Sequence, residues 1–195
     1  MSYVIAPLQD VKGLNHYPEY IQAMEALDHA ARSRAMRNWG QSNPPGGIFP
    51  SGVMAGGGPF RKNDMANDTA DNTPSGSYTF RKTFTATGWT DIFNYTVRKD
   101  MIHAFAGFLV SDDVLRITQL RMRFGQNSFP ILDIQEAQRY DRAAIIFKQD
   151  QGGELVVDQG SKVVIRVYLE TIGLQRVVPL GFQLYRRADM VTEET

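Results

Sequence analysis

Apolar and polar side chains alternate along most of the chain after residue 78, and this alternation predicts β-strands. Because successive side chains of a strand point to opposite faces, a strand of this kind has one buried and one solvated face. The stretch 162–170 is the clearest example. Its apolar side chains share one face and are Val163, Ile165, Val167 and Leu169. The stretch 180–187 repeats the pattern, with Phe182 on the apolar face and Gln183 and Tyr185 on the polar face.

Shorter runs of the same kind predict further strands, and turn signals rich in Gly, Asp and Asn separate them. The runs cover residues 78–84, 89–97, 101–110, 114–124, 131–135, 143–149 and 154–157. Within 114–124 the apolar positions change parity after Ile117 and resume at Leu120. A shift of one residue between the two faces of a strand indicates a β-bulge, which we expect near Thr118.

This series of strands predicts the fold class. About eight or nine short strands without helical segments between them are typical of a sandwich or a barrel. We therefore expect a mainly β protein built as an antiparallel β-sandwich. Eight strands in two sheets is the number of a jelly roll, so the sandwich is expected to be jelly-roll-like. The pattern leaves an immunoglobulin-like strand order open.

One stretch near the N-terminus follows a helical period instead. Pro18 suits a first helical turn, Glu19 lies where the helix dipole favours an acid, and Gly40 suits the position after the last turn. Apolar residues recur at spacings of three and four along one face, namely Tyr20, Met24, Leu27, Ala31 and Ala35. Small Ala side chains allow a close approach to another surface. That surface is either the protein's own domain or a neighbouring subunit.

The stretch 41–77 is rich in Gly and Pro, and it divides the chain into three regions. We expect an N-terminal arm and helix in 1–40, a long Gly/Pro-rich extended segment in 41–77 and a β-sandwich domain in 78–195. Long connections of this kind are uncommon inside compact domains and are often functional. This segment has few large apolar side chains, among them Phe49 and Phe60, so a neighbouring chain is the expected clamp.

Composition narrows the classes of partner. Lys and Arg number 21 and Asp and Glu number 21, so the formal net charge is zero. A nucleic-acid binder normally has a basic excess, so nucleic acid is not expected as a partner. The chain has no Cys, which fits synthesis in a reducing cytoplasm. It has no apolar run near the roughly 18 residues of a membrane span and no secretory signal pattern, so no membrane is expected.

No combination of residues predicts catalysis, a cofactor or a metal. His16 and His29 have no partner at zinc-ligand spacing, and His103 lies within an apolar strand as a packed histidine does. The chain lacks the Gly-x-Ser-x-Gly pattern of a serine nucleophile. The glycines 56–58 lack the Gly-Lys-Ser/Thr end of a phosphate-binding loop. We therefore expect a protein that is not an enzyme.

Arginines on one strand are the remaining polar signal. Arg121 and Arg123 alternate within 114–124. They either form a solvated face whose charges resist uncontrolled pairing or meet an acidic partner surface, for which the planar guanidinium is suited. With the apolar candidates above they complete the predicted interface set, which is Tyr20, Met24, Leu27, Ala31, Phe49, Phe60, Arg121 and Arg123.

The stretches 160–168 and 179–187 resemble the closing strands of small jelly-roll virion proteins. With its arm, helix, Gly/Pro-rich segment and sandwich, the whole chain is similar in plan to bacteriophage capsid decoration (cement) proteins and to single jelly-roll coat proteins. The resemblance implies a symmetric homo-oligomer, with a trimer favoured, and arms lying over neighbouring subunits. It also implies contacts with a major capsid protein or other virion subunits, no catalysis, and a place in the virion after synthesis in the host cytoplasm.

The expected function is therefore that of a capsid decoration protein that stabilises a phage shell. A single jelly-roll coat subunit is the close alternative. A carbohydrate- or ligand-binding sandwich module is the alternative from another class, because aromatic side chains stack on sugars. Its candidate platform residues are Trp89, Phe93, Tyr95 and Tyr140.

Overall fold

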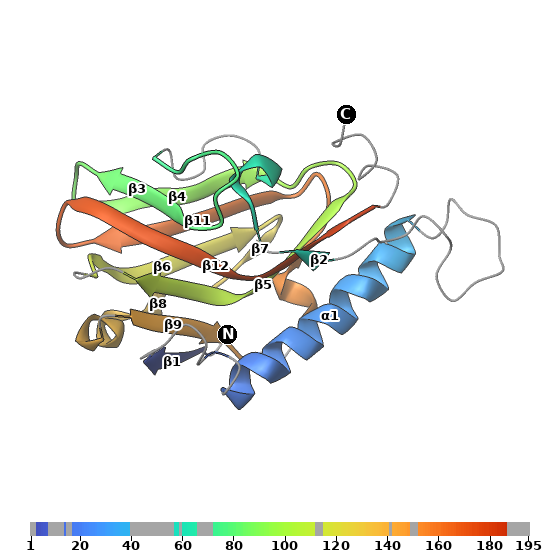
Figure 1. Ribbon diagram of the computed structural model, residues 1–195, viewed down its shortest axis with the longest axis horizontal. Coiled ribbons are helices and arrows are strands. Elements are labelled where there is room, and N and C mark those ends of the chain that lie inside the picture. Colours follow the sequence, from blue (N-terminus) through green and yellow to red (C-terminus); the bar gives the residue numbers. More distant parts are fainter. Residues whose placement is uncertain are drawn as a thin grey trace.

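Two antiparallel sheets face each other in the computed structural model, and one helix lies against the outer side of one sheet (Figure 1). The structure describes residues 3–7, 14, 17–39, 57–58, 60–65, 72–111, 115–140, 142–148 and 152–186. The helix is α1 (Pro18–Trp39), and the 3-10 turns are η3 (Lys62–Asp64), η4 (Gln135–Arg139) and η5 (Gly152–Leu155). The strands are β1 (Tyr3–Pro7), β2 (Gly57–Gly58), β3 (Phe80–Phe84), β4 (Gly88–Thr96), β5 (Met101–Ser111), β6 (Ile117–Phe124), β7 (Asn127–Ser128), β8 (Leu132–Asp133), β9 (Arg142–Phe147), β10 (Val156–Val157), β11 (Lys162–Leu169) and β12 (Gly173–Tyr185).

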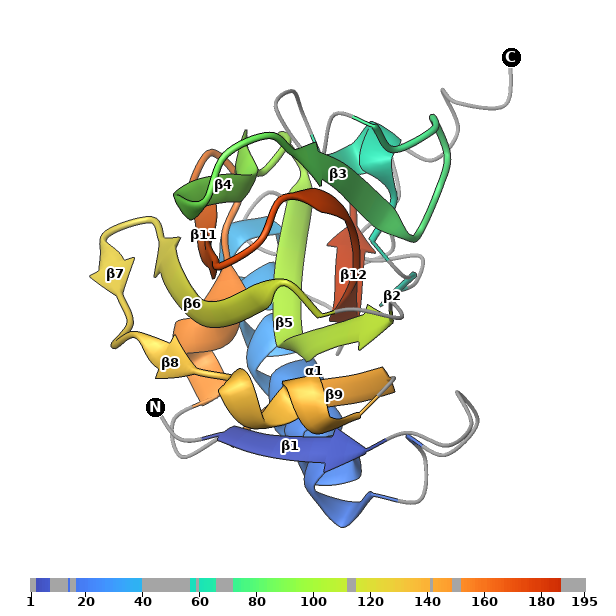
Figure 2. The same cartoon turned by 90° about the vertical axis from the view of Figure 1, so that its left-hand side faces the viewer.

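From β3 onward the strands pair in nested order, the earlier with the later. β3 pairs with β12, β4 with β11, β5 with β9, and β6 with both β7 and β8. The pairs alternate between the sheets, so one sheet contains β3, β12, β5 and β9 and the other β4, β11 and β6 (Figure 2). This nesting is the jelly-roll arrangement. The predicted mainly β sandwich is confirmed, and the immunoglobulin-like order is excluded.

The predicted bulge lies on β6. Along β11, Tyr168 faces Gln119 and the next residue, Leu169, faces Ile117, so Thr118 is the extra residue. Ile117 and Thr118 follow each other in the strand and are both buried. In a regular strand only one of two consecutive side chains faces the core, so the bulge accounts for this pair. The parity change in the sequence therefore located this irregularity correctly.

β12 is longer than the predicted stretch 180–187, because it begins at Gly173. Pro179 lies in its middle, where a residue without an N–H normally argues against a central strand. On one side β12 pairs with β5 both before and after Pro179. On the other side β3 reaches only to Val177 and β2 begins to pair only at Gln183, so neither flanks Pro179. A proline is tolerated at such a local edge. Elsewhere, the predicted strand 131–135 is only Leu132–Asp133, followed by η4.

The helix begins and ends where the sequence predicts, and it packs on its own domain. Its buried residues are Ala23, Leu27, Ala31, Ala35 and Trp39, and its main contacts are with β5, η5 and β9. Leu27 and Ala31 are both 0% exposed. Burial of a side chain such as Leu27 contributes about 2 kcal/mol. Leu27 and Ala31 therefore lie in the core of this chain and not on a surface open to a neighbouring subunit.

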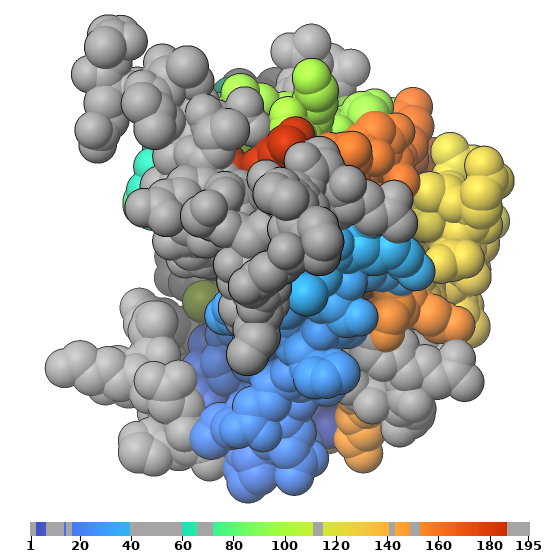
Figure 3. All heavy atoms as spheres, turned by 90° about the vertical axis from the view of Figure 1, so that its right-hand side faces the viewer, coloured from blue at the N-terminus to red at the C-terminus, as the bar shows by residue number. Residues whose placement is uncertain are grey.

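Arg34 fixes the second half of the helix to the sandwich. Its Nη1 donates to the carbonyl oxygen of Val156 at 2.7 Å and to Asp158 Oδ2 at 3.1 Å, and its Nη2 donates to the carbonyl oxygen of Gly153 at 2.5 Å. Hydrogen bonds from a charged donor are among the stronger ones in proteins. The opposite side of α1 forms part of the molecular surface in Figure 3.

Part of the predicted arm is a strand of this chain's own sheet. β1 pairs with β9 from Tyr3 opposite Phe147 to Pro7 opposite Ala143. Ala6 of β1, Leu27 of α1 and Phe60 belong to the same hydrophobic core as the sandwich. The predicted domain boundaries at 40/41 and 77/78 stay a prediction. Most of the stretch 41–77, including Phe49, lies outside the described residues.

Gly181 lies at the bulge in the pairing of β12 with β5. The register shifts there, because Leu180 faces Gly107 and Gly181 faces Phe105, leaving Ala106 as the extra residue on β5. Gly181 has φ +135°, and a Cβ at this position would lie 2.0 Å from the carbonyl oxygen of Ala104. A side chain is therefore excluded by contact as well as by backbone conformation.

We expect Gly181→Ala to lower the free energy of unfolding by about 3 kcal/mol or more, because a disfavoured φ and a backbone overlap add together. Gly160→Ala is the matched control, since Gly160 also has a positive φ (+74°) but a Cβ added there would meet no atom within 4 Å. It should lose only about 1 kcal/mol. Urea unfolding of both variants measures the difference, and equal losses would contradict the overlap.

Candidate partner-binding face and buried polar network

The outer face of the β4–β11–β6 sheet is polar and positively charged. Outward positions of the three strands, with Ser128 of β7, surround an open depression of about 400 Å³. Its lining residues are Asp91, Asn94, Arg121, Met122, Arg123, Ser128, Lys162, Val164 and Arg166. The two arginines predicted as interface residues, Arg121 and Arg123, are therefore brought together with cations from a second strand. We call Arg121, Arg123, Lys162 and Arg166 the basic face.

Strand register places the charges of this face in direct opposition. Arg166 of β11 faces Arg121 of β6 on one side and Asp91 of β4 on the other. Arg166 Nε lies 2.9 Å from Asp91 Oδ1, an ion-pair distance, but its N–H makes no hydrogen bond of good geometry. Asn94 Nδ2 donates to the other carboxylate oxygen of Asp91 at 2.9 Å. A single carboxylate thus lies among four cations.

The remaining cations of the basic face have no counter-charge in the described part of the chain. Arg121, Arg123 and Lys162 are exposed, and their side chains form no ion pair or hydrogen bond with another described residue. Like charges directly opposite each other on neighbouring strands destabilise a sheet. The face therefore points a concentrated positive charge at the solvent without a gain in the stability of the fold.

The predicted apolar interface residues lie elsewhere. Tyr20 and Met24 are half-buried and pack against the core, and burial raises the pKa of the Tyr20 hydroxyl. Phe60 is 1% exposed and stacks on Phe105 with ring centroids 4.7 Å apart. Phe60 is therefore an anchor within this chain, and a neighbouring chain is not needed to clamp it. Phe49 lies outside the described residues.

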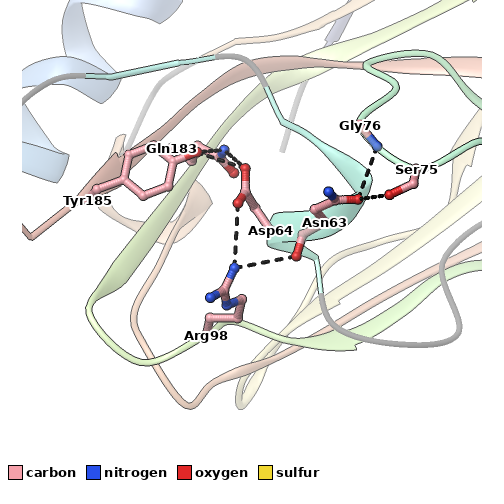
Figure 4. A network of polar contacts seen from close by, with 7 residues as sticks. All are labelled: Asn63, Asp64, Ser75, Gly76, Arg98, Gln183 and Tyr185. Atoms are coloured by element: carbon pink, nitrogen blue, oxygen red, sulfur yellow. Dashed lines mark hydrogen bonds and ion pairs between the residues drawn. The ribbon is translucent and has the colours of Figure 1, made fainter. Parts of the chain in front are cut away.

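A buried polar network holds residues 60–65 against β12 (Figure 4). Asp64 of η3 accepts a hydrogen bond at Oδ2 from Tyr185 Oη at 2.8 Å and from Gln183 Nε2 at 2.5 Å. Arg98 Nη1 lies 3.6 Å from Asp64 Oδ1 and forms an ion pair. Burial, and then the hydrogen bond to Asp64, raise the pKa of the Tyr185 hydroxyl well above its usual value. The carboxylate of Asp64 is thus paired on both oxygens.

Asn63 extends this network to the turn before β3. Its Oδ1 accepts hydrogen bonds from Ser75 Oγ at 2.7 Å and from the backbone N–H of Gly76 at 3.0 Å (Figure 4). In the sequence Asn63 and Asp64 lie within the stretch 41–77, which was predicted only as an extended segment. The available signal in the sequence was a large aromatic residue, Phe60, followed four positions later by a carboxylate, Asp64. Both side chains are buried and hold this segment on the sandwich.

Gln183 was predicted on a solvated face, and this prediction is wrong. Gln183 is 0% exposed, because residues 60–65 cover that end of β12. Phe182 points to the opposite side and lines an open groove with Met24 and Met36 of α1. The alternation predicted correctly that Phe182 and Gln183 point to opposite sides. It could not show that the polar side is covered by a segment more than a hundred residues away in the chain.

His103 joins the two sheets inside the sandwich. Tyr95 Oη of β4 and His103 Nδ1 of β5 are 2.8 Å apart and hydrogen-bonded, and the rings of Phe60 and His103 form a T-shaped contact. Burial lowers the pKa of His103 to about 3, so the imidazole is neutral near pH 7. Gln183 lies directly opposite in register, and its Oε1 and His103 Nε2 are both buried without a hydrogen-bond partner among the described residues. The packed histidine predicted from the sequence is confirmed.

The described residues contain no group of three or more His, Cys, Asp or Glu side chains arranged to hold a metal ion. Among the same residues no helix is long and apolar enough to cross a membrane. The paired Asp64 and the neutral His103 fix elements of the fold to one another. The basic face and the groove along α1 are two places where charged side chains gather on the described surface.

A scan against protein-family models, a search of curated proteins and a search of solved structures each found no match to this chain. The assignment of function therefore depends on the fold and on the surfaces described above.

The free energy of unfolding should fall as the pH decreases from 6.5 towards 3, because His103 protonates in the unfolded chain but stays neutral in the folded one. One such group changes the free energy of unfolding by at most about 1.4 kcal/mol per pH unit. Above pH 6.5 its stabilising contribution is fully present and no longer changes with pH. His103→Leu should remove that part of the slope. Urea unfolding of both proteins between pH 7 and about 4.5 measures it.

The control is His29→Gln, since His29 is exposed on α1. This variant should keep the slope of the unsubstituted protein. Because carboxylates titrate in all three proteins, only the difference between slopes reports on the imidazole. Identical slopes for His103→Leu and the unsubstituted protein would contradict a buried neutral His103.

Proposed function

We propose that this chain is a virion structural protein, in the first place a capsid decoration protein that stabilises a phage shell through contacts between subunits. The observation that carries the proposal is the nested pairing of β3 with β12, β4 with β11 and β5 with β9. This jelly-roll arrangement is the one from which many viral capsid proteins are built. Since lectins and cupins share it, the fold alone does not give the function, and surface features must support the proposal.

The two outer faces of the sandwich differ in a way that suits a protein attached to a surface. α1 covers the outer side of the sheet that contains β5 and β9. The outer side of the other sheet is open and carries the basic face. A rigid sandwich with one face closed by its own helix presents the second face in a fixed orientation. A subunit that reinforces a shell needs such a fixed contact face.

The alternative of a sugar-binding module is not favoured by its candidate residues. Phe93 and Tyr95 are buried between the sheets and cannot stack on a ligand. The ring of Trp89 packs edge-to-face on Tyr168, with centroids 5.5 Å apart. Tyr140, which is exposed, follows η4. These four side chains therefore do not form one aromatic platform.

A decoration protein and a coat subunit differ in what they assemble when expressed alone. For the proposed role we expect light scattering to give a small symmetric oligomer, with a trimer favoured, and electron microscopy to show no closed shells. Closed particles would instead assign the coat role. A monomer at every concentration would contradict the proposed homo-oligomer.

The virion assignment itself is tested in particles. Density-gradient-purified, nuclease-resistant particles from the culture that expresses this chain should contain it at a fixed ratio to the major capsid protein by peptide mass spectrometry. Mild dissociation should release it before the shell opens, because a decoration protein lies outside the shell. Abundant chain in the soluble fraction and none in the particles would overturn the proposal.

A further inference from the structure

The basic face has the charge and shape of an anion-binding surface. Neighbouring strands lie about 4.8 Å apart, so the facing side chains of Arg121 and Arg166 stand next to each other across β6 and β11. Arg123 and Lys162 lie beside them around the same depression. We propose that the basic face binds the carboxylate side chains of an acidic segment of a protein partner.

The type of cation favours carboxylates. Three of the four positive groups are guanidinium groups, whose planar fork donates two parallel hydrogen bonds to one carboxylate. The Arg166 Nε is already next to Asp91 and shows the ion-pair contact that this surface makes with a carboxylate of its own chain. Arg121 and Arg123 have the same group without such a contact in the described chain. They are the positions at which external carboxylates bind.

The surroundings of the cations disfavour a nucleic acid. The four cations of the depression are gathered around one carboxylate, that of Asp91, whereas a nucleic acid normally needs a more extended basic surface along its phosphate backbone. The zero net charge of the whole chain also provides no long-range attraction for a long nucleic acid, while a short acidic segment needs only the local cations. Arginine among mixed polar groups is typical of interfaces between proteins. The inference depends on this geometry and not on the virion role, so each can fail without the other.

The probe for the test is a fluorescein-labelled hexaglutamate peptide, and its binding is measured by fluorescence anisotropy over a range of salt concentrations. The unsubstituted protein should bind it, more weakly as salt increases. Arg121→Glu/Arg123→Glu should weaken binding about tenfold or more, since two attractive contacts become repulsive. Arg121→Lys/Arg123→Lys keeps the charge but loses the fork, and an intermediate loss of about threefold is expected.

Lys99→Glu/Arg139→Glu is the matched control, because it changes the net charge by the same amount at two exposed positions outside the depression. It should bind hexaglutamate within about twofold of the unsubstituted protein. Circular dichroism confirms that each variant is folded. No binding by the unsubstituted protein, or equal loss in the control variant, would overturn the proposal. Tighter binding of an oligothymidylate of equal charge would also overturn it, in favour of nucleic acid.

Discussion

The long antiparallel pairing of β5 with β12 is the interaction on which the other elements depend. It runs from Val110 opposite Val177 to Met101 opposite Tyr185 and is interrupted by one bulge. β9 adds to one side of this pair and β3 to the other, so the sheet grows outward from it. The outer face of β5 supports α1, while the inner face carries Phe105 and Phe108, which pack on Phe124 and Phe93 of the second sheet. The helix, the sheet and the aromatic core are thus positioned by the same two strands.

Polar groups at one end of the β5–β12 pair hold residues 60–65 in place. His103 and Gln183 face each other across β5 and β12, and one is bonded to Tyr95 of the second sheet and the other to Asp64 of η3. Buried polar groups are costly unless they are paired, so their partners must be present in the correct position for this end to close. Residues 60–65 are therefore part of the sandwich, although the composition around them is that of a linker.

Alternation of residue types predicted where most strands lie, because burial of one face leaves a direct mark on the sequence. It also located the bulge at Thr118, while Pro18 and Gly40 marked the limits of α1. It could not give the strand order, which depends on contacts between distant parts of the chain. For the same reason it misplaced Gln183, whose covering segment is remote, and it missed the start of β12 because Pro179 interrupts the pattern. Arg121 and Arg123 were visible as candidates, but only the register against β11 joins Lys162 and Arg166 to them.

The nested pairing has a consequence for the order in which the protein is made. β3 pairs with β12 and β4 pairs with β11, so both strands lack these partners until the later strands have been synthesised. Pairings between such distant segments require the closure of long loops and are slow to form. Until β12 leaves the ribosome the earlier strands keep open edges, which are prone to wrong pairing. The sandwich can therefore close only once β12 is available to join β3 and β5, however early the other strands have been made.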